Sequence, residues 1–157
     1  MVSQLELINP ANGEKFRELP YHNWDEAKSL LVKAGNTQKQ WKQTEISERI
    51  HLVKAAMDYF RDNKHSIAED ITQQMGKPIS QSMNEVMGMI HRAEVCCDLA
   101  EDALKDITFS EANGLRRFIK REPLGVVLDI AAWNFPLLIA VNVIAPAVLA
   151  GNTVAIK

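Results

Sequence analysis

The chain has 157 residues, which is enough for one domain of ordinary size. Hydrophobic residues make up 46% of it and charged residues 24%, a composition typical of a folded domain and not of a disordered segment. The 18 Lys and Arg residues are balanced by 20 Asp and Glu residues, so the formal net charge is -2. This balance gives no bulk positive charge for nucleic acid or an anionic membrane, and neither partner is expected.

Cysteine usage and the N-terminus both bear on the cellular compartment. The two cysteines, Cys96 and Cys97, are adjacent, so they form neither the disulfide framework of a secreted domain nor a CxxC zinc pair. The first six residues carry no basic patch followed by an apolar core, which argues against a signal peptide. We therefore expect a cytoplasmic protein, with Cys97 buried and unreactive on the apolar stripe of a predicted helix.

Residues 126–150 are mostly apolar and long enough to cross a bilayer. Asp129, Asn142 and two prolines, Pro136 and Pro146, interrupt this run. Because polar side chains are costly in hydrocarbon, a buried strand, a turn and a buried helix explain the run better than a membrane span.

In chain order, residues 1–22 predict a hairpin around the turn-forming segment 9–13. Residues 23–105 predict helices, because apolar residues recur there at helical spacing and Asn23 with Glu26 forms a capping pattern. The four predicted helices run from Asn23 to Trp41, from Ile46 to Phe60, over Ile67 to Met75 with Gly76 and Pro78 closing it, and from Ser80 or Ser82 towards Lys105.

Residues 106–122 show alternating apolar and charged side chains, with a turn expected at Gly114. This alternation predicts a strand segment with one charged face. The basic residues in it favour a solvated face or a subunit contact over a phosphate site; they are Arg116, Arg117, Lys120 and Arg121.

Residues 123–157 predict a βαβ unit. A buried strand is expected over 125–130, a buried helix from Pro136 to Ala150, and a second buried strand over 153–156. The connection between two parallel strands should be right-handed. Two parallel strands leave edges and faces that require more strands, so we expect this chain to be the front piece of a larger protein.

The usual short motifs are absent. The glycines form neither GxGxxG nor GxxxxGK[ST], and the histidines form no HExxH. A phosphate-cradling loop and a metal site are therefore not expected. The loop after the first parallel strand carries Trp133 and Asn134, at the carboxyl end where open α/β sheets bind ligands. From spacing alone, Asn134 is either a donor to a ligand or a cap of the following helix on which Trp133 packs.

Residues 122–157 resemble the aldehyde dehydrogenase superfamily. The resemblance is carried by EPLGVV at 122–127, WNFP at 133–136, APA at 145–147 and AGNTVAIK at 150–157. Weaker resemblances at 8–14 and 75–79 extend it over nearly the whole chain, whose pattern is similar to succinate-semialdehyde dehydrogenase-type members.

This resemblance implies an incomplete α/β fold, in which an N-terminal helical region leads into the first βαβ unit of a Rossmann-like parallel sheet. Residues 1–157 would then form part of an NAD(P)-binding domain. The family oxidises small aldehydes to carboxylic acids with NAD or NADP through a cysteine thiohemiacetal, and its members are homo-oligomers. By resemblance, Asn134 is the catalytic side-chain donor to the oxyanion, and the cofactor lies against Ile130, Ala131, Trp133, Asn134 and Lys157, whose side chain binds the adenosine ribose.

The chain departs from the family pattern at Ala132, where many members carry proline. Neither Cys96 nor Cys97 matches the nucleophile position, and the general-base glutamate and cofactor glycine loop have no match. We therefore expect the N-terminal third of the enzyme, inactive alone. The alternative is a non-catalytic remnant or interaction module that associates with a partner subunit.

Overall fold

A computed structural model describes residues 4–157 of the chain. Its elements follow the predicted order and type, which confirms the α/β arrangement with the helices first. They are β1 (Gln4–Ile8), β2 (Lys15–Pro20), α1 (Trp24–Trp41), α2 (Ile46–Asp62), α3 (Lys64–Met75), α4 (Ile79–Leu104), β3 (Ile107–Ala112), β4 (Leu115–Ile119), β5 (Val126–Asp129), α5 (Pro136–Leu149) and β6 (Thr153–Ile156).

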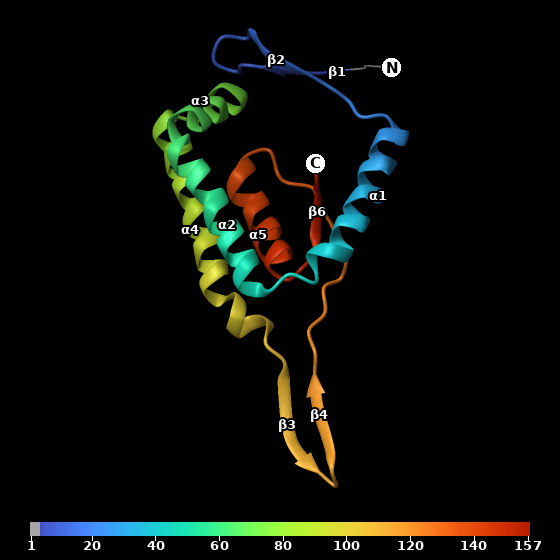
Figure 1. Cartoon of the computed structure of the whole chain (residues 1–157). Coiled ribbons are helices and arrows are strands. Elements are labelled where there is room, and N and C mark those ends of the chain that lie inside the picture. Colours follow the sequence, from blue (N-terminus) through green and yellow to red (C-terminus); the bar gives the residue numbers. More distant parts are fainter. Residues whose placement is uncertain (1–3) are drawn as a thin grey trace.

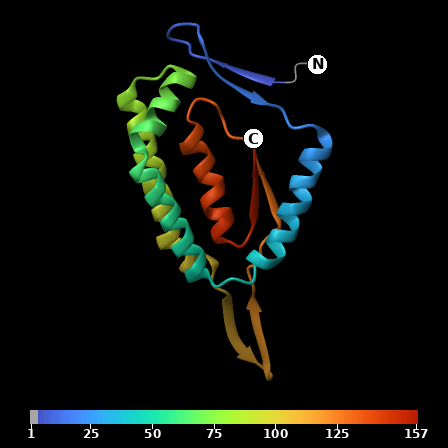
Figure 2. The ribbon, with the colours of Figure 1, turned by 45° about the horizontal axis from the view of Figure 1, so that its top comes forward.

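The core lies between the helices α2, α3, α4 and α5. The apolar stripes predicted from helical spacing face one another there, and α4 contributes the largest share of the buried side chains. Small residues such as Ala93 and Ala145 are fully buried where α4 packs against α5, so the two helices approach closely. In Figures 1 and 2, α5 lies between the helices α2 and α4 on one side and the β5–β6 pair on the other. Helix α1 covers the opposite side of the β5–β6 pair.

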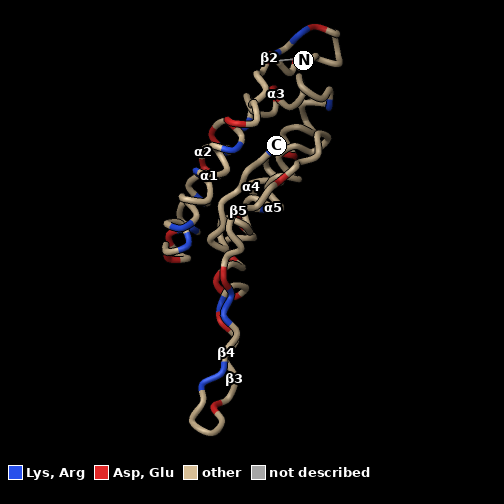
Figure 3. The backbone as a smooth tube through the Cα atoms, turned by 90° about the vertical axis from the view of Figure 1, so that its right-hand side faces the viewer, with Lys and Arg blue, Asp and Glu red and all other residues tan. Residues whose placement is uncertain are grey.

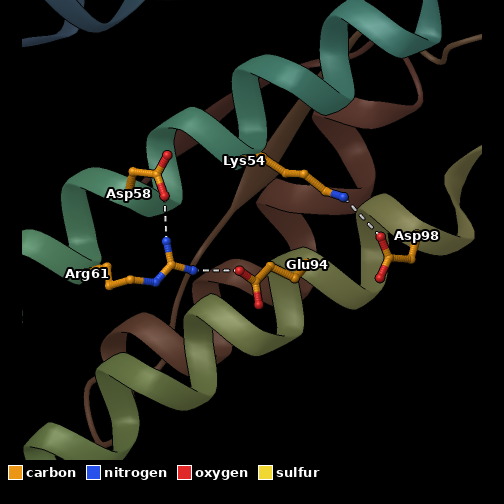
Figure 4. Close-up of polar contacts among 5 residues, drawn as sticks. All are labelled: Lys54, Asp58, Arg61, Glu94 and Asp98. Carbon is orange, nitrogen blue, oxygen red and sulfur yellow. Dashed lines mark hydrogen bonds and ion pairs between the residues drawn. The ribbon is translucent and has the colours of Figure 1, made fainter.

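Ion pairs also connect α2 with α4. Lys54 Nζ lies 3.1 Å from Asp98 and Arg61 lies 2.6 Å from Glu94. Figure 4 shows that each pair reaches from α2 to α4. Arg61 also contacts Asp58 on its own helix at 2.5 Å. All of these side chains are at least partly exposed, so each pair contributes only about 0–1 kcal/mol. Apolar packing therefore provides most of the stability of this contact.

The parallel pair β5–β6 is in register from Val126 opposite Thr153 to Asp129 opposite Ile156. The prediction that 125–130 is a buried strand is wrong for this chain, because Leu128 is 65% exposed and Val126 is also exposed. The physical reason is that no third strand pairs with β5 or β6 within residues 4–157. Both are edge strands, and one face of β5 is open to solvent.

Two antiparallel hairpins stand outside the helical core. The β1–β2 hairpin packs against the α3–α4 turn, where Pro10 lies against Gly76. The β3–β4 hairpin projects away from the body in Figures 1 and 3, and every residue of both strands is exposed. Asn113 and Gly114 both have positive φ, of 55° and 73°, as the two central residues of a tight hairpin turn require. The turn expected at Gly114 is confirmed.

Candidate active and cofactor site

All five residues assigned to the site by resemblance lie at the carboxyl edge of the β5–β6 pair. Parallel strands end at the same edge, so Ile130 and Ala131 after β5 lie beside Lys157 after β6. The contact is direct, because the Ala131 N–H donates to the Lys157 carbonyl oxygen at 3.1 Å. Trp133 and Asn134 follow in the same loop, before α5 begins. The backbone thus brings together two residues, Ala131 and Lys157, that are 26 positions apart in the sequence.

The Asn134 side chain is exposed and has no hydrogen-bond partner among residues 4–157. The N-cap position of α5 is occupied by Phe135, and no side chain at that position caps the helix. Of the two interpretations left open by the sequence, a cap formed by Asn134 is therefore not the arrangement found. The amide is free to donate to a group outside the described residues.

Trp133 does not pack flat on the helix either, because 79% of its surface is exposed. It borders a cavity of about 400 Å³ that lies between β1, α3 and the start of α5. The walls are mostly apolar, with Ile71 and Met75 of α3 opposite Pro136. The loop therefore has a hollow on one side and solvent on the other.

The sequence reasoning missed one side chain that contacts this region. Glu85 of α4 is fully buried, and its Oε1 accepts hydrogen bonds from the N–H groups of Leu137 at 3.0 Å and Leu138 at 3.3 Å. Its Oε2 pairs with the buried Lys77 ammonium. The missed signal was positional: Glu85 lies four residues before the buried Met89, so a carboxylate falls on the core-facing row of the helix.

The other end of α5 is held by side chains from α1 and α2. A helix ends with carbonyl groups that have no partner inside it. Here Trp41 Nε1 donates to the Val148 carbonyl at 2.9 Å, and Arg49 Nη1 donates to the Leu149 carbonyl at 2.8 Å. The positive charge of Arg49 also suits the negative end of the helix dipole.

The Gly-Asn-Thr segment after α5 has a structural role at the edge of the sheet opposite the site. Gly151 has a φ of 84°, which reverses the chain. Asn152 is buried; its Oδ1 accepts from the Gly125 N–H at 2.9 Å and its Nδ2 donates to the Ala147 carbonyl at 3.1 Å. One side chain thus fixes the start of β5 against the end of α5.

Two further side chains that could react or ionise, Cys97 and Asp129, are buried. Cys97 is buried, and burial raises the pKa of its thiol above the ordinary value, so the protonated, unreactive form predicted from the sequence is favoured. Asp129 is buried at the end of β5, and its Oδ2 has no hydrogen-bond partner in the described structure. Within residues 4–157, no group of three potential metal ligands is found, and no helix is long and apolar enough to cross a membrane.

Comparison with known proteins identifies the family to which the chain belongs. The family model described as "Aldehyde dehydrogenase family" matches residues 2–157. A 3,6-anhydro-alpha-L-galactose dehydrogenase of Vibrio sp. (strain EJY3) is 32% identical over 152 residues, which cover 97% of this chain and 32% of the relative. The succinate semialdehyde dehydrogenase [NAD(P)+] Sad of Escherichia coli (strain K12) is also 32% identical, over 96% of this chain and 32% of its own length.

Solved structures are equally similar. A NADP-dependent glyceraldehyde-3-phosphate dehydrogenase from Bacillus halodurans C-125, complexed with NADP, superposes with a TM-score of 0.91 at 31% identity, over 99% of this chain and 34% of that one. The structure of a 3,6-anhydro-L-galactose dehydrogenase in complex with NAP gives a TM-score of 0.91 at 29% identity, over 98% and 32%. This chain thus spans about a third of the length of the relatives it matches. With a family model that matches almost every residue, the chain belongs to the aldehyde dehydrogenase family.

Proposed function

We propose that this chain is the N-terminal third of an NAD(P)-dependent aldehyde dehydrogenase, which oxidises a small aldehyde to a carboxylic acid. The overall reaction consumes one aldehyde, one water and one oxidised cofactor, and it releases the carboxylate, the reduced cofactor and two protons. The observation that carries the proposal is the unpartnered Asn134 amide in the loop whose Ala131 N–H donates to the Lys157 carbonyl, in a chain that matches the family throughout.

The role of Asn134 is that of an oxyanion donor. When a thiolate adds to an aldehyde carbon, negative charge develops on the former carbonyl oxygen. An N–H group that is already in place at that oxygen stabilises the charge without further reorganisation. The side chain of Asn134 suits this task because it is exposed, neutral and not engaged by its own helix. Loss of one such donor costs a factor of about 10² to 10³ in kcat.

The role of Ile130, Ala131, Trp133 and Lys157 is to form one side of a cofactor groove. The open edge of β5–β6 fits an extended dinucleotide, because Ile130 and Trp133 are exposed there and the exposed Lys157 follows β6 at the same edge. A dinucleotide held in this groove would supply the acceptor for the hydride of the substrate. The chain's own contribution is to orient that cofactor with Trp133 and to bind its ribose with Lys157.

The homo-oligomer that we propose would use the β3–β4 hairpin. This hairpin exposes apolar side chains together with its arginines, on two strands whose residues are all exposed. The exposed apolar residues are Ile107, Phe109, Leu115, Phe118 and Ile119. We further propose a cytoplasmic location, which the free thiols of Cys96 and Cys97 support.

The experiment that tests the function begins with the coding DNA beyond the Lys157 codon. If the reading frame continues, the extended product is purified and the formation of reduced nicotinamide is followed with a panel of small aldehydes. We expect turnover with NAD or NADP for the extended product and none above blank for residues 1–157. Turnover by residues 1–157 alone, or an extended product that oxidises no aldehyde, would contradict the proposal.

The exposed face and edge of β5 favour a second candidate, a non-catalytic module that binds a partner subunit. A stop codon after Lys157, together with a monodisperse product that melts cooperatively, would support this module. A reading frame that continues past the Lys157 codon would instead support the incomplete enzyme domain.

A further inference from the structure

The first turn of α5 begins directly after the Asn134 loop and has no cap of its own. The first N–H groups of an α-helix lack partners inside the helix and must find them elsewhere. Pro136 has no N–H, so the donors that need a partner are those of Leu137 and Leu138. Both donate to one atom, Oε1 of Glu85, which lies 52 and 53 residues earlier in the chain. Glu85 thus supplies from α4 the cap that the local sequence lacks.

Lys77 extends this contact to the loop itself. Its ammonium is buried, pairs with Glu85, and lies 3.9 Å from the centroid of the Phe135 ring. Phe135 is the residue immediately after Asn134. The charges are arranged favourably, because the Glu85 carboxylate faces the positive end of α5 and the Lys77 ammonium compensates it.

The loop has a second attachment on its other side. There the Ala131 N–H donates to the Lys157 carbonyl at 3.1 Å. Between the two attachments lie Trp133 and Asn134, whose side chains make no hydrogen bond within residues 4–157. The position of the Asn134 amide is therefore set by the backbone on either side of it.

We propose that Glu85 and Lys77 are positioning residues for Asn134. They fix the first turn of α5 and the Phe135 ring, and through them the direction in which the Asn134 side chain leaves the backbone. The significance of that direction rests on the proposed function, in which Asn134 donates to an oxyanion. A purely structural ion pair would stabilise the fold without affecting the order of the loop.

The test compares two double variants that differ only in the acceptor. Lys77→Met/Glu85→Gln removes both charges and keeps an amide oxygen for Leu137 and Leu138. Lys77→Met/Glu85→Leu also removes both charges, at similar volume, but offers no acceptor. Replacing a buried ion pair with uncharged residues of similar size is often neutral for stability, so both variants are expected to fold. Glu94→Gln, on the same helix but in an exposed pair, is the control.

The measurement is amide hydrogen exchange and nuclear magnetic resonance of the 157-residue chain and its variants. We expect protected Leu137 and Leu138 amides in the unmodified chain, in the control and in the Gln variant. In the Leu variant these amides should exchange at least about tenfold faster, and the backbone and side-chain signals of Asn134 should broaden. Fast exchange of both amides in the unmodified chain, unchanged signals in the Leu variant, or equal disorder in both variants would overturn the proposal.

These readouts do not depend on turnover, so they separate this inference from the proposed function. If an extended protein oxidises aldehydes, the Leu variant should lower its kcat at least about tenfold relative to the Gln variant. A disordered loop with an unchanged kcat would overturn the positioning role while leaving the enzyme assignment intact. Intact loop contacts in a protein that oxidises no aldehyde would refute the proposed function alone.

Discussion

Replacement of Arg49 by Met should destabilise the chain strongly, because one guanidinium joins three segments. Arg49 Nη1 donates to the Leu149 carbonyl at 2.8 Å, Nη2 to the Thr44 carbonyl at 2.6 Å, and Nε to Thr44 Oγ1 at 3.1 Å. Methionine keeps an unbranched, flexible stem but leaves these acceptors without their donor. The α1–α2 loop and the end of α5 would lose their shared partner.

The magnitude follows from the two shortest of these bonds. A hydrogen bond from a charged donor contributes about 1.5–3 kcal/mol, and the partial exposure of Arg49 places each of the two bonds at the lower end, so we expect a loss of about 3–4 kcal/mol. For a chain of this size that corresponds to a fall in Tm of about 5–15 °C. The assay is urea and thermal unfolding followed by circular dichroism.

Two further variants make the Arg49 prediction specific. Arg49→Lys keeps the charge, but its single ammonium group cannot replace the donors to the α1–α2 loop and to the end of α5 at once. Its stability should therefore lie between those of the unmodified chain and Arg49→Met. Arg92→Met, which removes an exposed arginine with one bond to Asn142, should change stability by less than about 0.5 kcal/mol. An Arg49→Met variant as stable as Arg92→Met would refute the reasoning, as would full stability of Arg49→Lys.

Three other predictions concern single side chains. Asp129→Val should raise the stability of the chain by about 1 kcal/mol, because it removes a buried oxygen without a partner and places a β-branched residue in a strand; a lower Tm would contradict this. Gly76→Ala should destabilise the chain by at least about 1 kcal/mol, because φ at this position is +77° and the new Cβ would lie 2.8 Å from Pro10 Cγ. The control Gly35→Ala, in the middle of α1 with nothing within 4 Å of the new Cβ, should instead stabilise the chain. Cys97 should react with a maleimide far more slowly than Cys96 at neutral pH, because burial raises the pKa of its thiol. Equal labelling of Cys96 and Cys97 in the folded chain would be inconsistent with the structure. Because the pKa of the Cys97 thiol is raised on folding, the stabilisation from the protonated thiol is complete below the ordinary thiol pKa and is lost as the pH rises through the folded-state pKa.

Local patterns were sufficient to predict the elements. The capping box predicted at Asn23 and Glu26 is present, with Asn23 Oδ1 accepting at 3.0 Å and Glu26 Oε2 at 2.8 Å. Pro136 begins a helix, and Gly76 ends one in the left-handed conformation. Each of these features depends on residues within a few positions of one another, which is the distance over which sequence patterns carry information.

The connections between elements could not be predicted in the same way. Glu85 caps a helix more than 50 residues away, and Arg49 reaches a carbonyl 100 residues away. Their side chains are ordinary members of helices until the fold brings a partner to them. The burial expected for β5 failed for a related reason: the apolar pattern predicts a strand covered on both faces, and residues 4–157 cover only one. That the candidate residues after β5 and after β6 lie at one edge was predictable, because both parallel strands must end there.

The role of Asn134 is the central claim, and a single matched measurement tests it most directly. In the extended product, Asn134→Ala should lower the kcat for aldehyde oxidation by a factor of about 10² to 10³. Asn142→Ala, which removes a second exposed amide at the seventh residue of α5, should leave kcat within about twofold of the unmodified enzyme. A kcat for Asn134→Ala as high as that for Asn142→Ala would contradict the account, because the amide at the edge of β5–β6 would then take no part in the reaction.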